Sequence, residues 1–239
     1  MKEKEISIII PTLNEADRIG RLLLHLDKNA TPKGIKEIII VDGGSTDETL
    51  NSITTIKTEL QAIPSIEVIT ALRGRARQMN AGAAKAQGTI LYFLHADSFP
   101  PQGFDTHIIR KVKNGNQAGC FRMRFDSSHW WLRLASWLTQ FSWRACRGGD
   151  QSQFITAQLF KELGGFDERF EIYEDNDLIN KLYARKEFVV IQKKLTTSSR
   201  RYQSNGIWKL QYHFLAIYVK KWFGASAEEL HSYYKKHIA

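Results

Sequence analysis

The 239-residue chain has few cysteines and no long apolar run, and both absences narrow its class. Its two cysteines, Cys120 and Cys146, form neither a metal-ligand pattern nor a disulfide framework, which is typical of a protein from a reducing cytoplasm. No apolar run approaches the roughly 18 residues that cross a bilayer. The charged residues 1–5 do not have the pattern of a secretory signal. We therefore expect a cytoplasmic protein, with peripheral contact at the inner face of the membrane left open.

The chain also lacks a G-x-G-x-x-G fingerprint, an internal repeat, a low-complexity segment and an obvious linker. The missing fingerprint argues against the dinucleotide-binding class. The other absences favour a single domain over residues 1–239. Positive charge is in excess, because 34 Lys and Arg against 25 Asp and Glu give a formal net charge of +9. That surplus favours anionic partners, which include nucleotide diphosphates, nucleic acid and acidic lipid headgroups.

Hydrophobic periodicity predicts an α/β fold. In the first hundred residues, apolar runs predict strands at residues 6–10, 38–41, 66–69 and 90–94. The segments between them predict helices at residues 19–26, 45–60 and 75–86, and a capping box of Ser45 and Glu48 opens the second. Such alternation is typical of a mostly parallel sheet covered by helices on both sides. Later segments predict strands at 118–125, 154–156 and 189–191, helices at 104–113, 129–144, 158–163 and 175–185, and a helical tail from residue 207.

The strand at residues 90–94 leads into His95 and Asp97. A continuous apolar run indicates a strand buried on both faces, and ligands of open α/β sheets bind at the carboxyl edge of such strands. A carboxylate there, beside a second oxygen or nitrogen ligand, suits a divalent cation that holds a diphosphate. An isolated pair of this kind is more often an Asp that caps the next segment, so the interpretation depends on the neighbouring motifs.

Two further motifs follow predicted strands. Asp42 ends the second strand before two glycines, which allow a tight turn close to a ligand, and we interpret it as binding a base or ribose. Arg73, Arg75 and Arg77 surround a helix start, where helix amides and guanidinium groups together can clamp a diphosphate. Arg77 and Asn80 share one helix face and favour binding. Arg75 fits a solvated basic turn.

Residues 167–177 contain six acids, more than helix capping requires. One of these carboxylates could act as a general base if it reaches the proton to be removed. The loops at Gln151 and Arg200 are weaker signals. The tail carries apolar residues at helical spacing, which fit either a membrane-interface helix or a helix packed on the core. They are Trp208, Tyr212, Leu215, Val219 and Trp222.

These segments, in this order, resemble the family-two glycosyltransferases of the GT-A fold. The matching motifs are residues 10–15 (IPTLNE), 41–47 (VDGGSTD), 74–82 (GRARQMNAG), 94–97 (LHAD), 164–166 (GGF) and 174–175 (ED). The resemblance covers nearly the whole chain. It implies a Rossmann-like, mostly parallel central sheet flanked by helices, with a helical C-terminal tail. More narrowly, the arginine loop and residues 95–97, 149–151 and 197–201 resemble a bacterial subgroup of transferases associated with radical-SAM and selenium genes.

The resemblance implies a nucleotide-diphosphate sugar donor, a divalent cation (Mn²⁺ or Mg²⁺) and inversion at the anomeric carbon. It implies that Asp97 is the metal ligand and Asp175 the catalytic base. The residues that would bind substrate are Pro11, Thr12, Glu15, Asp42, Arg73, Arg77, Asn80, His95, Ala96, Asp150, Gln151, Glu174 and Arg200. His95 departs from the family pattern, in which Asp is usual, although Mn²⁺ also accepts imidazole. Residues 1–100 would then form the nucleotide-sugar half, 101–205 the acceptor side and 206–239 the helical tail.

Three alternatives compete with a transferase. A sugar-phosphate nucleotidyltransferase would carry a glycine-rich basic signature near the N-terminus, where this chain has residues 10–15 instead. A nucleic-acid-binding protein fits the clustered arginines, but carboxylates at strand and helix ends would repel phosphate without a metal. A catalytically silent nucleotide-sugar-binding protein is favoured by His95 alone. The acceptor stays unidentified, with a lipid-linked one among the alternatives, and the oligomeric state stays open.

Overall fold

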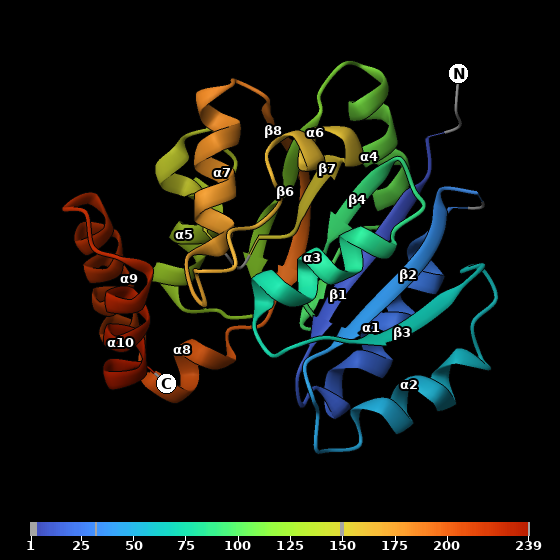
Figure 1. The fold of residues 1–239 in the computed structure, drawn as a ribbon, viewed down its shortest axis with the longest axis horizontal. Coiled ribbons are helices and arrows are strands. Elements are labelled where there is room, and N and C mark those ends of the chain that lie inside the picture. The colour runs from blue at the N-terminus through green and yellow to red at the C-terminus, as the bar shows by residue number, and fades with distance from the viewer. Residues whose placement is uncertain (1–3, 32, 149–150, 239) are drawn as a thin grey trace.

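The computed structural model describes residues 4–31, 33–148 and 151–238. Its centre is one eight-stranded sheet in the order β3-β2-β1-β4-β7-β6-β8-β5 (Figure 1). The strands are β1 (Ile6–Thr12), β2 (Ile35–Asp42), β3 (Ile66–Thr70), β4 (Ile90–Phe93), β5 (Ser98–Phe99), β6 (Ala118–Phe125), β7 (Gln153–Thr156) and β8 (Phe188–Thr197). The first four pair in parallel, β7 is antiparallel to both β4 and β6, and β6 pairs in parallel with β8. This topology confirms the predicted α/β class.

Helices cover both faces of the sheet (Figure 1). They are α1 (Ala16–Asn29), α2 (Thr49–Lys57), α3 (Arg75–Lys85), α4 (Phe104–Lys113), α5 (Trp130–Leu138), α6 (Ala157–Glu162), α7 (Glu174–Ala184), α8 (Arg200–Asn205), α9 (Ile207–Trp222) and α10 (Ala227–His237). A 3₁₀ turn, η1 (Arg144–Cys146), follows α5. Among the described residues, no helix combines the length and hydropathy needed to cross a bilayer.

Alternating side chains of β1 build two cores, one on each face of the sheet. Ile8 and Ile10 belong to the cluster that includes the apolar side of α1, whereas Ile9 belongs to the cluster with Met79 of α3 and Leu178 of α7. This alternation follows from the two-residue period of a strand. A third cluster lies beneath the C-terminal helices. Helices α9 and α10 occupy one end of the longest axis, and α2 and β3 occupy the other (Figure 1).

Helix α3 lies unusually close to the sheet because it packs through a glycine. A Cβ on Gly82 would come within 2.5 Å of Cγ2 of Ile9 and 3.0 Å of Cγ2 of Val41. Because any side chain there would push the helix away, Gly82 holds the N-terminus of α3 over the ends of β1 and β2.

Two helix predictions were wrong at their boundaries. The capping box at Ser45 does not form: α2 begins at Thr49, and Asp47 accepts hydrogen bonds from the backbone N–H and hydroxyl of that threonine. The aromatic helix predicted to reach residue 144 stops at Leu138. There the buried Arg147 donates to the carbonyls of Thr139 and Phe141 at 2.6 and 2.7 Å. Its guanidinium group thus supplies a donor to carbonyl oxygens that have no partner within the helix.

The last strand is longer than its apolar run predicts. Residues 189–191 were predicted, and β8 extends from Phe188 to Thr197. The extension includes three exposed polar residues, Gln192, Lys193 and Lys194. Pairing with β6 shifts register here, from Phe121 opposite Ile191 to Arg122 opposite Lys194, and then continues to Thr197. Its consequence is that Thr197 and the following residues reach the same edge as the end of β4.

Candidate active site

The strand order changes direction between β1 and β4, and a cleft of about 690 Å³ opens near their carboxyl ends. In open α/β sheets this position is where ligands bind. Many residues predicted from the sequence line it: Pro11, Thr12, Glu15, Arg73, His95, Ala96, Asp97 and Arg200. Segments separated by up to about two hundred residues therefore meet in one cavity, and the binding roles of these residues stay predictions.

The loop after β1 is held by polar contacts at the rim of the cleft. Glu15 forms ion pairs with Arg18 at 3.0 Å and with Arg200 at 3.5 Å, which links this loop to the start of α8. Gln78 of α3 donates from Nε2 to the carbonyls of Thr12 and Val41, both at 2.8 Å. Gln78, which the sequence motifs did not single out, therefore ties the ends of β1 and β2 to the arginine helix.

Asp42 lies just beyond this loop, and its carboxylate is occupied by its own turn. It is 2% exposed and accepts hydrogen bonds from the backbone N–H groups of Gly44 and Ser45, each at 2.9 Å. The hydroxyl of Ser45 donates to its second oxygen. Gly44 has φ 91°, which only glycine adopts without strain. These contacts make Asp42 the residue that shapes the turn, and it is absent from the lining of the cleft.

His95 and Asp97 leave the end of β4 half-buried, and both line the cleft. In the described part of the chain, no group of three or more His, Cys, Asp or Glu residues is placed to hold a metal. One carboxylate and one imidazole nevertheless fit a cation such as Mn²⁺ that takes its remaining ligands from phosphate oxygens and water. The donor set therefore suits a metal that binds together with a diphosphate.

Arg75 binds the two carboxylates at the start of α7. Its Nε lies 2.6 Å from Oε1 of Glu174, and its Nη2 lies 3.0 Å from Oδ2 of Asp175. The Glu174 side chain is fully buried and that of Asp175 is 9% exposed, whereas that of Arg75 is 37% exposed. The prediction of Arg75 as a solvated turn residue was wrong, because its guanidinium group binds two carboxylates. The sequence did not reveal this, since these partners lie 99 and 100 positions away.

Tyr173 sets the direction in which α7 begins. It occupies the N-cap with φ 76°, a left-handed conformation that is strained for a bulky residue. Glu174, Asp175 and Asp177 form the first turn, where the helix dipole favours negative charge. The strained turn therefore places Asp175 in the first turn of α7, beside Arg75.

Arg77 and Asn80 lie outside the cleft. Arg77 donates from Nη1 to the carbonyl of Arg73 at 3.4 Å. Asn80 exchanges hydrogen bonds with the backbone of Phe166, donating at 2.9 Å and accepting at 3.0 Å. It also donates to Glu168 at 2.9 Å. The contacts of Asn80 favour a structural role, in which it fixes the loop that leads toward α7.

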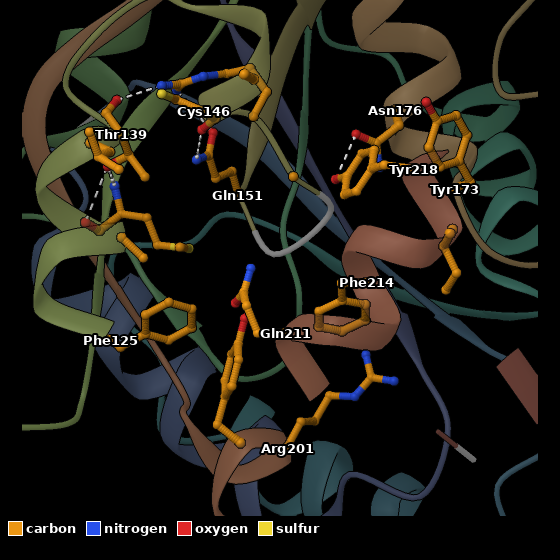
Figure 2. Close-up of a pocket in the computed structure, with 18 of the residues that line it drawn as sticks. Phe125, Thr139, Cys146, Gln151, Tyr173, Asn176, Arg201, Gln211, Phe214 and Tyr218 are labelled. Carbon is orange, nitrogen blue, oxygen red and sulfur yellow. Dashed lines mark hydrogen bonds between the residues drawn. The ribbon is translucent and has the colours of Figure 1, made fainter. Parts of the chain in front are cut away.

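A second cavity of about 580 Å³ adjoins the cleft and is mostly aromatic and apolar at its walls. Figure 2 shows Phe125, Gln211, Phe214 and Tyr218 around its open centre. Gln151 lines this cavity rather than the cleft, and Asp150 lies outside the described residues. Cys146 lines it too, while Cys120 lies beneath the wall, where burial raises the pKa of its thiol.

The C-terminal helices close both cavities. Arg75, Glu171, Ile172, Arg201, Tyr202, Phe214 and Tyr234 line the cleft and the aromatic cavity alike. Arg201 lies over the ring of Tyr234 at 5.6 Å, a cation–π contact between α8 and α10. Of these residues, Arg201 belongs to the motif at residues 197–201, whereas no sequence motif identified Phe214 and Tyr234, which tertiary packing brings to the ends of the strands.

A mostly parallel sheet with a cleft at its switch point places the chain among the open α/β proteins, whose ligands bind at that edge. A profile of Glycosyl transferase family 2 matches residues 7–173, and the chain belongs to this family. A probable glycosyltransferase, YdaM of Bacillus subtilis, is 25% identical over 202 residues, or 77% of this chain and 48% of the relative. A dolichyl-phosphate-sugar diacetamido-glucuronosyltransferase of Methanococcus voltae is 37% identical over 103 residues, or 41% of this chain and 31% of the relative. The chain thus spans less than half the length of these two relatives.

Solved structures show that the fold is GT-A. The mannosyltransferase PcManGT of Pyrobaculum calidifontis, in complex with GDP-mannose and Mn²⁺, superposes with a TM-score of 0.70 at 19% identity. That superposition covers 98% of this chain and 70% of PcManGT. TarS of Staphylococcus aureus, residues 1–349 with UDP, superposes with a TM-score of 0.65 at 18% identity, covering 81% and 60% of the two chains. The GT-A fold implied by the sequence motifs is confirmed.

Removing Arg75 should destabilise the protein more than removing its neighbour Arg77. In Arg75→Gln, the buried carboxylate of Glu174 loses its partner, and we expect the free energy of unfolding to fall by about 1–3 kcal/mol. Arg77→Gln, which breaks one long backbone contact, should change it by less than about 0.5 kcal/mol. Urea unfolding measures both, and Glu174→Gln in the Arg75→Gln background should recover part of the loss. Equal effects of the two single changes would contradict the buried pairing.

Proposed function

We propose that the chain transfers a sugar from a nucleotide-diphosphate sugar to an acceptor hydroxyl, with inversion at the anomeric carbon and with a divalent cation. One observation carries the proposal: Arg75, which lines both cavities, binds the carboxylates of Glu174 and Asp175. Neither carboxylate belongs to the described lining of the two cavities, but Asp175 lies 3.0 Å from Arg75, which we place between the two proposed substrate sites.

The polar cleft is the proposed donor site. Pro11, Thr12 and Glu15 would contact the nucleoside, above the turn that Asp42 shapes. Arg73 and Arg200 face the same cleft and would bind phosphate oxygens. TarS in complex with UDP and PcManGT in complex with GDP-mannose support a nucleotide-sugar donor, because their fold is shared.

His95 and Asp97 would hold the cation, which when bound neutralises charge on the departing diphosphate. The complexes of related folds with Mn²⁺ or Mg²⁺ support this assignment. Positive side chains in the cleft would add to the same stabilisation, since they are fixed before the bond breaks.

The aromatic cavity is the proposed acceptor site. An acceptor hydroxyl attacking opposite the departing diphosphate must lose its proton, and Asp175 would accept it. Arg75 would hold that carboxylate in one orientation from the donor side. In this assignment residues 1–100 bind the donor, residues 101–205 supply the acceptor side, and the tail closes both cavities.

The arginine loop and residues 197–201, which contribute Arg200 and Arg201, support the narrower resemblance to the radical-SAM and selenium-associated subgroup. We propose that membership as well. A nucleotidyltransferase and a silent nucleotide-sugar-binding protein remain the competing functions. They differ from a glycosyltransferase in the ligands that they bind and in the products that they release.

Titration of the protein with UDP and with GDP, each with and without Mn²⁺, tests the proposal. One of the two should raise the melting temperature only when Mn²⁺ is present. At a ligand concentration a hundredfold above Kd, binding should increase the free energy of unfolding by about 2.7 kcal/mol. A sugar 1-phosphate with a nucleoside triphosphate is the matched ligand pair for a nucleotidyltransferase. Stabilisation by that pair and by neither diphosphate would contradict the proposal.

A further inference from the structure

All six tryptophans of the chain lie in two short segments, residues 130–143 and 208–222. Five of them are at least half exposed: Trp130 (60%), Trp137 (51%), Trp143 (60%), Trp208 (56%) and Trp222 (84%). Tryptophan is highly buried on average, and large exposed apolar patches mark interaction sites. The concentration of exposed tryptophan on one part of the surface therefore calls for a partner.

Helix α9 presents a complete apolar stripe to solvent. Its buried side is formed by Leu210 and Ile217, which pack into the third core cluster. The opposite side carries exposed residues at intervals of three and four, so they fall on one line along the helix. These are Trp208 (56%), Tyr212 (66%), Leu215 (60%), Val219 (42%) and Trp222 (84%), and Phe223 (80%) follows directly.

Helix α5 continues the same surface. The ring of Trp208 in α9 lies 5.8 Å from that of Trp130 and 5.2 Å from that of Trp131. Along α5, Leu134 (39%) and Trp137 (51%) extend the exposed apolar side one and two turns beyond Trp130. The exposed apolar sides of α5 and α9 form one patch, the α5–α9 face.

The two segments that carry this face contain no acidic residue, and the next acids along the chain after α9 are Glu228 and Glu229 at the start of α10. Residues 188–227 and residues 127–148 contain no Asp or Glu. Exposed cations lie close to the apolar stripe, with Arg133 on α5 and Lys209 and Lys220 on α9. The two lysines project roughly 100–120° around the helix from the stripe, along its edge toward a surface on which the stripe lies. In the structure the ammonium group of Lys220 lies 5.2 Å from the ring centre of Tyr233 on α10. A protein partner would need acidic groups in matching positions, whereas an anionic membrane offers them everywhere.

We propose that the α5–α9 face lies in the headgroup region of a membrane that contains anionic lipids. Tryptophan and tyrosine prefer this interface, and each nearby lysine adds attraction to the negative surface. The face also borders the aromatic cavity, because Leu134 belongs to both and Gln211, Phe214 and Tyr218 line the cavity from α9. Membrane binding through this face would place the mouth of the cavity beside the lipid, where an acceptor with an apolar body is held.

Flotation with two kinds of vesicle tests the proposal without any assay of transfer, so its failure would leave the proposed function standing. The full-length protein should float with vesicles of phosphatidylcholine and phosphatidylglycerol, float weakly with phosphatidylcholine alone, and detach as salt is raised. Because every tryptophan lies in or beside the face, the intrinsic fluorescence should shift to the blue as vesicles are added. Lys209→Gln should weaken binding roughly fivefold.

Two matched variants separate the face from general hydrophobicity. Leu215→Glu places an acid in the stripe and should abolish flotation, whereas Leu50→Glu makes the same change at an exposed site on α2 and should have no effect. No flotation of the wild type with the mixed vesicles would overturn the proposal. So would flotation that Leu215→Glu leaves unchanged, or a dimer in solution that Leu215→Glu dissociates, since the face would then bind a second copy.

Discussion

Asp175→Asn should lower the rate of sugar transfer by roughly 10²- to 10⁴-fold and leave donor binding nearly unchanged. Asparagine keeps the shape of the side chain and a contact with Arg75 but cannot take a proton from the acceptor at neutral pH. The size of the effect is that of losing a positioned acid–base group. Asp175 is separated from the donor cleft by Arg75, so the affinity for the nucleotide should not depend on its charge. The rate with saturating donor and acceptor, together with the Kd for the nucleotide diphosphate, measures the two effects separately.

Asp177→Asn is the matched control for this change. Asp177 belongs to the same first turn of α7 but forms its ion pair with Lys181 at 2.8 Å, away from Arg75. We expect it to retain most of the transfer rate. If Asp175→Asn lost nucleotide binding instead while turning over normally at saturation, Asp175 would be a binding residue. Glu174 would then be the next candidate for the base.

Asp97→Ala should abolish metal-dependent binding of the nucleotide diphosphate while the protein stays folded. Asp97 lies half-buried beyond β4, outside the cores that stabilise the sheet. Since it would contact the metal directly, the loss should exceed the roughly 10- to 100-fold that removing an outer partner of a metal ligand causes. Calorimetric titration with Mn²⁺ present measures the loss, and the melting temperature without ligand checks the fold.

Two companion variants define what Asp97 does. Asp17→Ala removes an exposed acid in the first turn of α1 that does not line the cleft, and should bind the nucleotide like the wild type. His95→Asp keeps a metal ligand but replaces nitrogen by oxygen, so the preference should move from Mn²⁺ toward Mg²⁺. If folded Asp97→Ala bound the nucleotide with undiminished Mn²⁺ dependence, Asp97 would not be a metal ligand.

The sheet and one side of the cleft could be predicted because they depend on local pattern and on a general property of parallel strands. Buried runs such as residues 6–10 and 90–94 identify strands without any tertiary information. The carboxyl ends of parallel neighbours lie at one edge, so polar residues after β1 and β4 had to come together. Asp97 was found by this reasoning and Glu15 through the resemblance to family-two glycosyltransferases, and both line the cleft.

The rest of the site depends on contacts between distant segments. Arg75 was predicted to be a solvated residue, but it binds two carboxylates of α7 that lie about a hundred positions away in the sequence. Asp42 was predicted to bind a base or ribose, which stays a prediction, and its motif did not reveal the hydrogen bonds that its carboxylate accepts within its own turn. The tail pattern fitted either a membrane-interface helix or a helix packed on the core, and it did not reveal that α8, α9 and α10 form a wall of both cavities. No periodicity encodes these contacts, because each one is set by packing and hydrogen bonding in the folded chain.

The most direct measurement of the central claim is the identity of the phosphorus-containing product. The protein is incubated with Mn²⁺ and a panel of UDP- and GDP-sugars, with vesicles that carry lipid hydroxyl acceptors, and the products are followed by phosphorus NMR. We predict that one nucleotide sugar is converted to the free nucleoside diphosphate, and that Asp175→Asn, which still binds the donor, releases it at the reduced rate given above. Release of a nucleoside monophosphate with sugar 1-phosphate, or saturable donor binding with no product from any sugar of the panel, would contradict the account.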